Sequence, residues 1–150
     1  MKTITLRCIA LLFVLALAVA GPQVHGHEKK VGGPQGGRLL KAIDPHAEFF
    51  VTPERKVQIT FLDAADKPVA PTGQSVVVTI GERAAPATLS FTRKGNSLLS
   101  DQVIPAGDDL PTVVQIKTSP DAKEVVERFH LGFAKCPDCK NPEYACTCGH

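Results

Sequence analysis

The sequence predicts an all-β fold, an antiparallel immunoglobulin-like β-sandwich of seven or eight short strands with a cysteine-rich C-terminal tail. Two observations favour this class. Short stretches of β-branched and aromatic residues follow one another, and turn residues separate them about every eight to twelve positions. No stretch carries a convincing helical period. A small β-barrel is the alternative architecture, and the Cys–Trp–Cys core of antibody domains is absent because the chain has no Trp.

The predicted strands alternate apolar and polar residues or are rich in β-branched residues. They comprise residues 38–43, 46–51, 56–62, 75–80, 87–92, 97–100, 112–117 and 124–133. The clearest is 56–62, where Val57, Ile59 and Phe61 share one face and polar residues the other. This period of two is typical of a half-buried strand. Residues 38–133 are therefore predicted to form the β-sandwich domain.

The last predicted strand has a helical alternative. Residues 121–128 carry helix-forming side chains, but paired valines and the alternation that follows them favour a strand. In that strand Phe129, Leu131 and Phe133 would face inward. His130 would lie on the opposite face as a surface histidine, and His46 is also expected to be a surface or hydrogen-bonded histidine rather than a ligand.

The N-terminus is predicted to be a cleaved signal peptide over residues 1–20. Lys2 and Arg7 precede an uncharged apolar run that is too short to span a membrane and ends in small residues. Residues 21–37 follow as a flexible leader rich in Gly and Pro. Its His25 and His27 are expected to be solvated, with loose metal chelation as the alternative. The protein is thus expected to be exported, to the periplasm or outside the cell, and to have no membrane insertion after cleavage.

Charge excludes one class of partner. Without the two cations of the predicted signal, fifteen Lys and Arg balance fifteen Asp and Glu. A neutral chain lacks the clustered basic surface that nucleic-acid binding requires. No motif for a Ser–His–Asp triad or a phosphate-binding loop is present either, so the chain is predicted not to be an enzyme.

The tail, residues 134–150, concentrates the side chains capable of chemistry. Four of the five cysteines lie here as Cys136-x-x-Cys139 and Cys146-x-Cys148, followed by His150. A tight turn would aim the first pair of sulfurs at one point, and a chain reversal at Asn141-Pro142 would bring the second pair back. Four thiolates suit tetrahedral zinc, and two or three suit copper(I). Lys135 and Lys140 would offset the negative charge of such a site.

Two other interpretations of the tail stay open. In an exported protein, Cys136 could pair with Cys148 and Cys139 with Cys146 as nested disulfides. Alternatively, Cys-Pro-Asp-Cys superficially resembles the active site of an oxidoreductase. Those motifs begin a helix, whereas this one follows a strand in a loop-rich tail.

Part of the chain resembles small exported bacterial domains associated with heavy-metal efflux systems. The resemblance covers about a third of the chain and lies in the stretches 36–40, 46–51, 57–63 and 67–69. Related sequences often have His-Gly-Gly where this one has Gln35-Gly36-Gly37, so a metal-binding role of the leader is not supported. The resemblance implies a β-rich periplasmic domain and a metal-efflux or envelope protein as partner.

The predicted function is capture or buffering of zinc or copper(I) by an exported protein. The ligands would be Cys136, Cys139, Cys146 and Cys148, with His150 as an optional ligand that could complete a set of three thiolates and an imidazole. The alternative is a non-catalytic structural or interaction domain whose tail is stapled by two disulfides.

Overall fold

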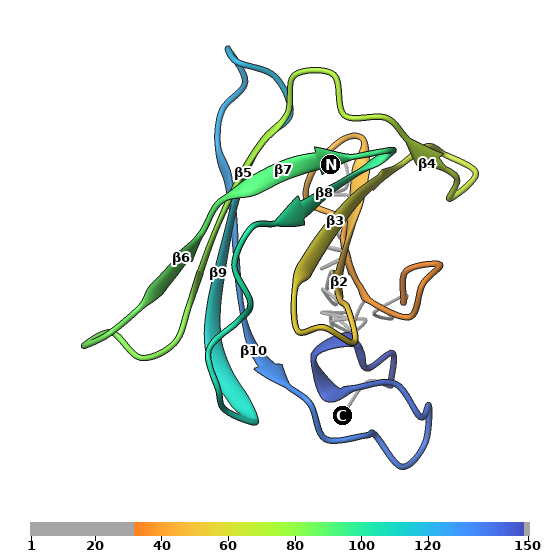
Figure 1. The fold of residues 1–150 in the computed structure, drawn as a ribbon. Coiled ribbons are helices and arrows are strands. Elements are labelled where there is room, and N and C mark those ends of the chain that lie inside the picture. Colours follow the sequence, from red (N-terminus) through yellow and green to blue (C-terminus); the bar gives the residue numbers. More distant parts are fainter. Residues whose placement is uncertain (1–31, 149–150) are drawn as a thin grey trace, which may run out of the picture.

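Two antiparallel β-sheets form the body of the molecule and enclose its core (Figure 1). The computed structural model describes residues 32–148. One sheet has six strands in the order β1-β2-β3-β8-β7, with β4 paired to β3, and the other has four in the order β10-β9-β5-β6. The all-β class and the separation into two sheets are confirmed, while the immunoglobulin-like type of sandwich stays a prediction.

The six-stranded sheet contains β1 (Arg38–Leu40), β2 (His46–Val51), β3 (Val57–Leu62), β4 (Pro68–Val69), β7 (Phe91–Lys94) and β8 (Ser97–Ser100). The four-stranded sheet contains β5 (Ser75–Ile80), β6 (Ala87–Leu89), β9 (Asp109–Lys117) and β10 (Val125–Gly132). One short 3₁₀-helix, η1 (Glu143–Ala145), lies in the tail. No helix within residues 32–148 has the length and apolar character needed to cross a membrane.

The core consists of the inward-facing residues of both sheets. Val57, Ile59 and Phe61 are fully buried on β3, as their alternation predicts, but Thr60 and Leu62 on the other face are buried as well, so β3 is not the half-buried strand predicted. Phe49 on β2 packs its ring edge-to-face against Phe129 on β10, with 5.2 Å between the ring centroids. This contact joins the two sheets near the end where the tail lies, and burial of such aromatic rings dominates the energetics of a core.

Several predicted strand boundaries were wrong: the strand 38–43 ends at Leu40, β4 was not predicted, and two further differences involve the four-stranded sheet. The predicted strand 87–92 is two strands, because the chain leaves one sheet after β6 and enters the other at β7. The predicted strand 112–117 begins earlier, because β9 starts at Asp109 and pairs with β10 from Asp109 to Ile116. Pro111 is tolerated there since β5 pairs with β9 only as far as Thr112. The choice of a strand over a helix for the last element is confirmed by β10.

The remaining sequence predictions for the ends of the chain fall outside the described residues. These are the signal peptide, most of the leader including His25 and His27, and the terminal His150. Residues 32–37, which were assigned to the leader, form a turn in which the N–H of Gly33 donates to the carbonyl of Gly37 at 2.9 Å.

Candidate metal centre

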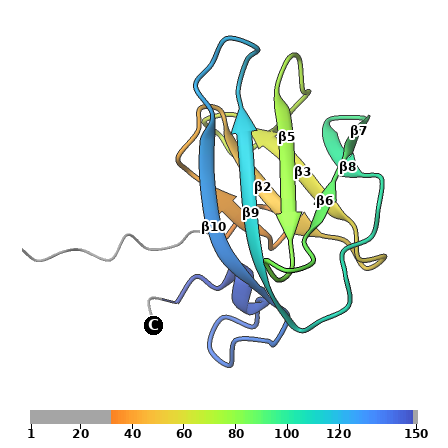
Figure 2. The same cartoon turned by 90° about the vertical axis from the view of Figure 1, so that its left-hand side faces the viewer.

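The tail folds back on the end of the two-sheet body, beside β10 and β1 (Figure 2). The segment from Cys136 to Cys148, which we call the cysteine loop, carries η1 at its middle. Tyr144 and Ala145 of η1 are only 4% and 3% exposed and belong to the core. The Tyr144 ring packs edge-to-face on Phe49 and on Phe133, with 6.1 Å between centroids in each case. The loop is therefore an integral part of the fold.

A hydrogen bond ties η1 to the six-stranded sheet. The backbone N–H of Val51 donates to the Tyr144 hydroxyl at 3.1 Å. Val51 is the last residue of β2, so the tyrosine satisfies a donor where strand pairing ends. Burial raises the pKa of the Tyr144 hydroxyl, and Glu48 nearby raises it further. The phenol therefore stays neutral and holds the loop by packing and one hydrogen bond.

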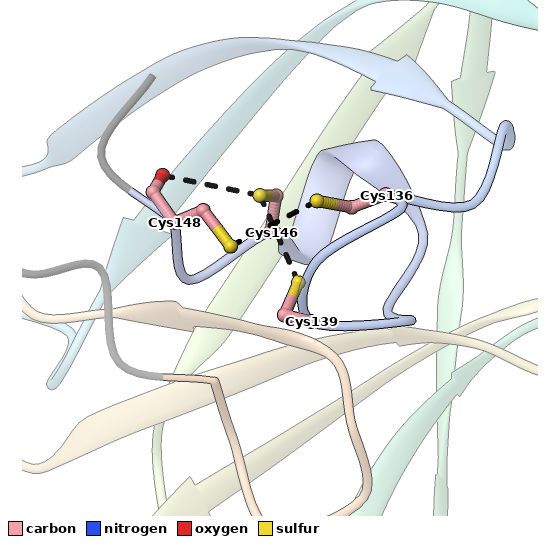
Figure 3. Close-up of side chains that lie close together, drawn as sticks. All are labelled: Cys136, Cys139, Cys146 and Cys148. Atoms are coloured by element: carbon pink, nitrogen blue, oxygen red, sulfur yellow. Dashed lines mark hydrogen bonds between the residues drawn. The ribbon is translucent and has the colours of Figure 1, made fainter.

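The first two cysteines lie on a tight turn. The N–H of Cys136 donates to the carbonyl of Asn141 at 2.9 Å, and the N–H of Lys140 donates to the carbonyl of Cys136 at 3.0 Å. Lys140 takes a left-handed backbone conformation with φ of 64°, which lets the chain reverse so sharply. This turn brings the Cys136 and Cys139 side chains to the same side of the loop (Figure 3).

The second two cysteines follow η1 directly. The N–H of Cys146 donates to the carbonyl of Glu143 at 3.1 Å and ends the 3₁₀ turn. Cys146 is extended, with φ of −62° and ψ of 133°. The extended chain carries Cys148 past the first turn, so Cys146 and Cys148 face the earlier pair (Figure 3).

All four sulfur atoms converge, and no other cysteine lies within residues 32–148. The Sγ atoms of Cys136 and Cys148 are 3.8 Å apart, as are those of Cys139 and Cys146. All four sulfurs lie within 4.8 Å of one another, and no disulfide joins any two of them. A tetrahedral zinc ion with Zn–S bonds of about 2.3 Å requires sulfur–sulfur edges of about 3.8 Å. The set is therefore close to the size that such an ion needs.

Backbone donors tune the thiols unequally. The backbone N–H groups of Thr147 and then Asn141 lower the pKa of the Cys139 thiol. Loss of solvation and the neighbouring cysteines raise the pKa of Cys148 to about 12. Desolvation also raises the pKa of Cys146. Crowded thiols that resist ionisation suit a site where a cation replaces their protons.

A buried carboxylate lies on β2, which pairs with β1. Glu48 is fully buried and accepts hydrogen bonds from the N–H groups of Gln35 at 2.9 Å and Gly37 at 2.8 Å. A Cβ atom on Gly33 would lie 2.3 Å from the Glu48 side chain, so only glycine fits there. The same turn reaches the cysteine loop, because a Cβ on Gly32 would lie 3.2 Å from the Thr147 methyl group. The sequence prediction missed both this support and Tyr144, although Tyr144 is the only tyrosine in the chain.

None of the other candidate residues that the structure describes belongs to the group of four sulfurs. His46 bonds the carbonyl of Ile43 at 2.8 Å, and the exposed His130 bonds Asp109 at 3.2 Å. Both fit the expected surface or hydrogen-bonded roles. Lys135 and Lys140 are exposed, and the Lys140 ammonium donates to the carbonyl of Pro137.

No family model, curated protein or solved structure matches the chain. Function is therefore inferred from the chemistry of the four cysteines, which together could hold a metal ion.

Proposed function

We propose that the protein captures one zinc ion per chain through the thiolates of Cys136, Cys139, Cys146 and Cys148. The observation that supports this most directly is the convergence of four sulfurs, none of them in a disulfide, at spacings near those of a tetrahedral site. Capture also requires that the ion can enter, and Cys139, Cys146 and Cys148 are each partly exposed.

Zinc suits this donor set better than copper(I). Soft thiolates bind both metals, and tetrahedral four-sulfur geometry is typical of zinc or iron. Copper(I) is satisfied by two or three thiolates, which would leave at least one of these sulfurs unused. His150 lies just beyond the described residues, so its role as an optional ligand stays a prediction.

A structural role of the ion is the second candidate, and the burial of η1 favours it. Tyr144 and Ala145 lie between the first and second pairs of cysteines in the sequence. An ion that holds the two pairs together would also hold Tyr144 against Phe49. Closed four-thiolate zinc sites in other proteins contribute folding free energy in this way.

The setting that we propose is an exported protein that works beside a metal-efflux or envelope protein. The apolar run and small-residue ending of residues 1–20 support export, and the resemblance of stretches between residues 36 and 69 supports the partner.

The proposal is tested by metal analysis and thiol counting on protein isolated without reductant or chelator. We expect one zinc per chain and four thiols that react with a thiol reagent only after a strong chelator is added. Two disulfides and no bound metal in the fresh protein would contradict it.

Replacing Cys139 with Ser should weaken zinc binding at least about a hundredfold. The control Ser119→Ala, in the exposed turn between β9 and β10, should leave it unchanged.

Exchange and unfolding separate capture from a structural role. For capture, a competing chelator removes the ion within minutes and the metal-free protein stays folded. For a structural role, removal is slow and lowers the melting temperature. The fluorescence of Tyr144 reports the state of the loop without interference, because the chain has no Trp and no other Tyr.

A further inference from the structure

The arrangement of the four sulfurs supports a second chemistry at the same site. The pairs that lie 3.8 Å apart each join one end of the cysteine loop to the other, Cys136 to Cys148 and Cys139 to Cys146. A disulfide has a sulfur–sulfur bond of about 2.05 Å, so each pair needs to approach by about 1.8 Å. Two side chains share that movement.

The alternative is a disulfide within each motif, Cys136-x-x-Cys139 and Cys146-x-Cys148, and this pairing is unfavourable. If Cys136 bonded Cys139, the remaining partners would be Cys146 and Cys148, which are separated by a single residue. A bridge that short is strained. Complete oxidation within the chain therefore favours bridges between the two motifs, and the nested pairs, at 3.8 Å, are close enough to form them.

The two pairs differ in their access to solvent. Cys136 is only 2% exposed, whereas Cys139 and Cys146 are both partly exposed. An oxidant in solution reaches a pair with two accessible sulfurs more readily than a pair with a buried member. We therefore expect the disulfide between Cys139 and Cys146 to form before the one between Cys136 and Cys148.

We propose that the cysteine loop is a site of ordered oxidative modification in which a disulfide oxidant bridges Cys139 to Cys146 first and thereby releases the metal. This inference rests on the proposed zinc binding and names how the ion is let go. It needs an oxidant of the disulfide class, either a small molecule or the oxidised form of a dithiol protein.

The chemistry balances in two steps. The thiolates of Cys139 and Cys146 lose two electrons and form one S–S bond, and the S–S bond of one oxidant molecule breaks to give two thiolates. Two protein thiolates remain on the zinc, a pair that holds the ion far less firmly than four, and the ion leaves. A second oxidant molecule then converts Cys136 and Cys148 into the second bridge in the same way.

The body of the protein is expected to survive this change. Tyr144 lies inside the segment that a Cys139–Cys146 bridge would enclose. The bridge would replace the ion as the link that holds η1 against Phe49 and Phe133. Metal release thus occurs without exposure of the core, and reduction of the bridges restores the binding site.

The test treats zinc-loaded protein with oxidised glutathione. Released zinc is followed with a coloured zinc indicator, remaining thiols are counted, and bridges are mapped by peptide mass after alkylation. We expect one zinc to be released as the first two thiols disappear, with Cys139 bridged to Cys146, and Tyr144 fluorescence to stay close to its starting value. Zinc retained until all four thiols are lost, or a first bridge within either motif, would overturn the inference.

Paired variants test the order independently of the metal. In metal-free reduced protein, Cys136→Ser with Cys148→Ser leaves the accessible pair, and Cys139→Ser with Cys146→Ser leaves the pair with the buried sulfur. The first double variant should form its bridge on the order of tenfold faster than the second. Equal rates would overturn the order. If the wild-type protein never binds zinc, the proposed function fails, whereas bound zinc with the wrong first bridge refutes only this inference.

Discussion

The two-sheet body and the cysteine loop hold their shapes in different ways. The body buries large apolar side chains such as Phe49, Ile59 and Phe61 between two sheets. The cysteine loop buries little beyond Cys136, Tyr144 and Ala145, and it relies on backbone hydrogen bonds and on four sulfurs that could share an ion. The body should therefore respond to changes in packing, and the loop to changes in metal, protons and oxidants.

The largest expected effect is that of pH on metal binding. At neutral pH Cys146 and Cys148 hold their protons in the metal-free protein, because the pKa of each thiol is raised, whereas the pKa of Cys139 is lowered. Zinc displaces these protons, so acid favours the metal-free form. We expect zinc binding to release about three to four protons. The affinity for zinc should therefore fall by roughly three to four orders of magnitude for each unit by which the pH is lowered.

Competition titrations between pH 6 and pH 8 measure this slope, and calorimetry in buffers of different ionisation enthalpy counts the protons directly. An affinity that is independent of pH would show that thiolates are not the ligands.

A packing change in the body should act whether or not metal is present. Phe49→Ala removes a fully buried ring that contacts both Phe129 and Tyr144. Loss of burial and the cavity left behind should lower the free energy of unfolding by about 3–5 kcal/mol. Urea unfolding with and without zinc measures this. The control Val77→Ala, at a position 41% exposed on β5, should cost less than about 0.5 kcal/mol.

Tyr144→Phe tests the link between the two regions. The variant keeps the ring but leaves the N–H of Val51 without its 3.1 Å acceptor. We expect the zinc-loaded protein to lose about 1 kcal/mol of unfolding free energy, with zinc affinity changed by less than about threefold. A large drop in affinity would mean that the hydroxyl, and not the ring, sets the position of the cysteine loop.

The smallest effect is a gain. Lys140 has a φ of 64°, a conformation that glycine adopts without steric cost. Lys140→Gly should raise the unfolding free energy of the zinc-loaded protein by about 0.5–1 kcal/mol. Lys135→Gly, at the isolated bridge to Pro142, should instead lower it by a similar amount. If both variants were destabilising to the same extent, the turn would not be strained at Lys140.

The sequence predicted best what depends on local pattern. The alternation of β3 and β5 identified their buried faces, and the spacing of the cysteines anticipated that their sulfurs meet. The change of sheet at Ser90 was missed, because residues 87–92 read as one alternating strand. Nothing local marks the point where a strand leaves one sheet for another.

The supports of the site depend on contacts that are distant in sequence. Glu48 stands among buried residues of β2, and only the turn at residues 33–37 explains how its carboxylate is satisfied. The docking of Tyr144 on Phe49 spans most of the described chain. A lone aromatic residue in a polar tail does not reveal its partner, so packing of the loop against the body could not be predicted.

X-ray absorption at the zinc edge tests the central claim most directly. Reduced protein is loaded with one equivalent of zinc, and the first coordination shell is measured. We predict four sulfur ligands at about 2.3 Å in the wild-type protein and in Ser119→Ala, and fewer than four in Cys139→Ser. A shell made mainly of oxygen or nitrogen would contradict the four-thiolate site.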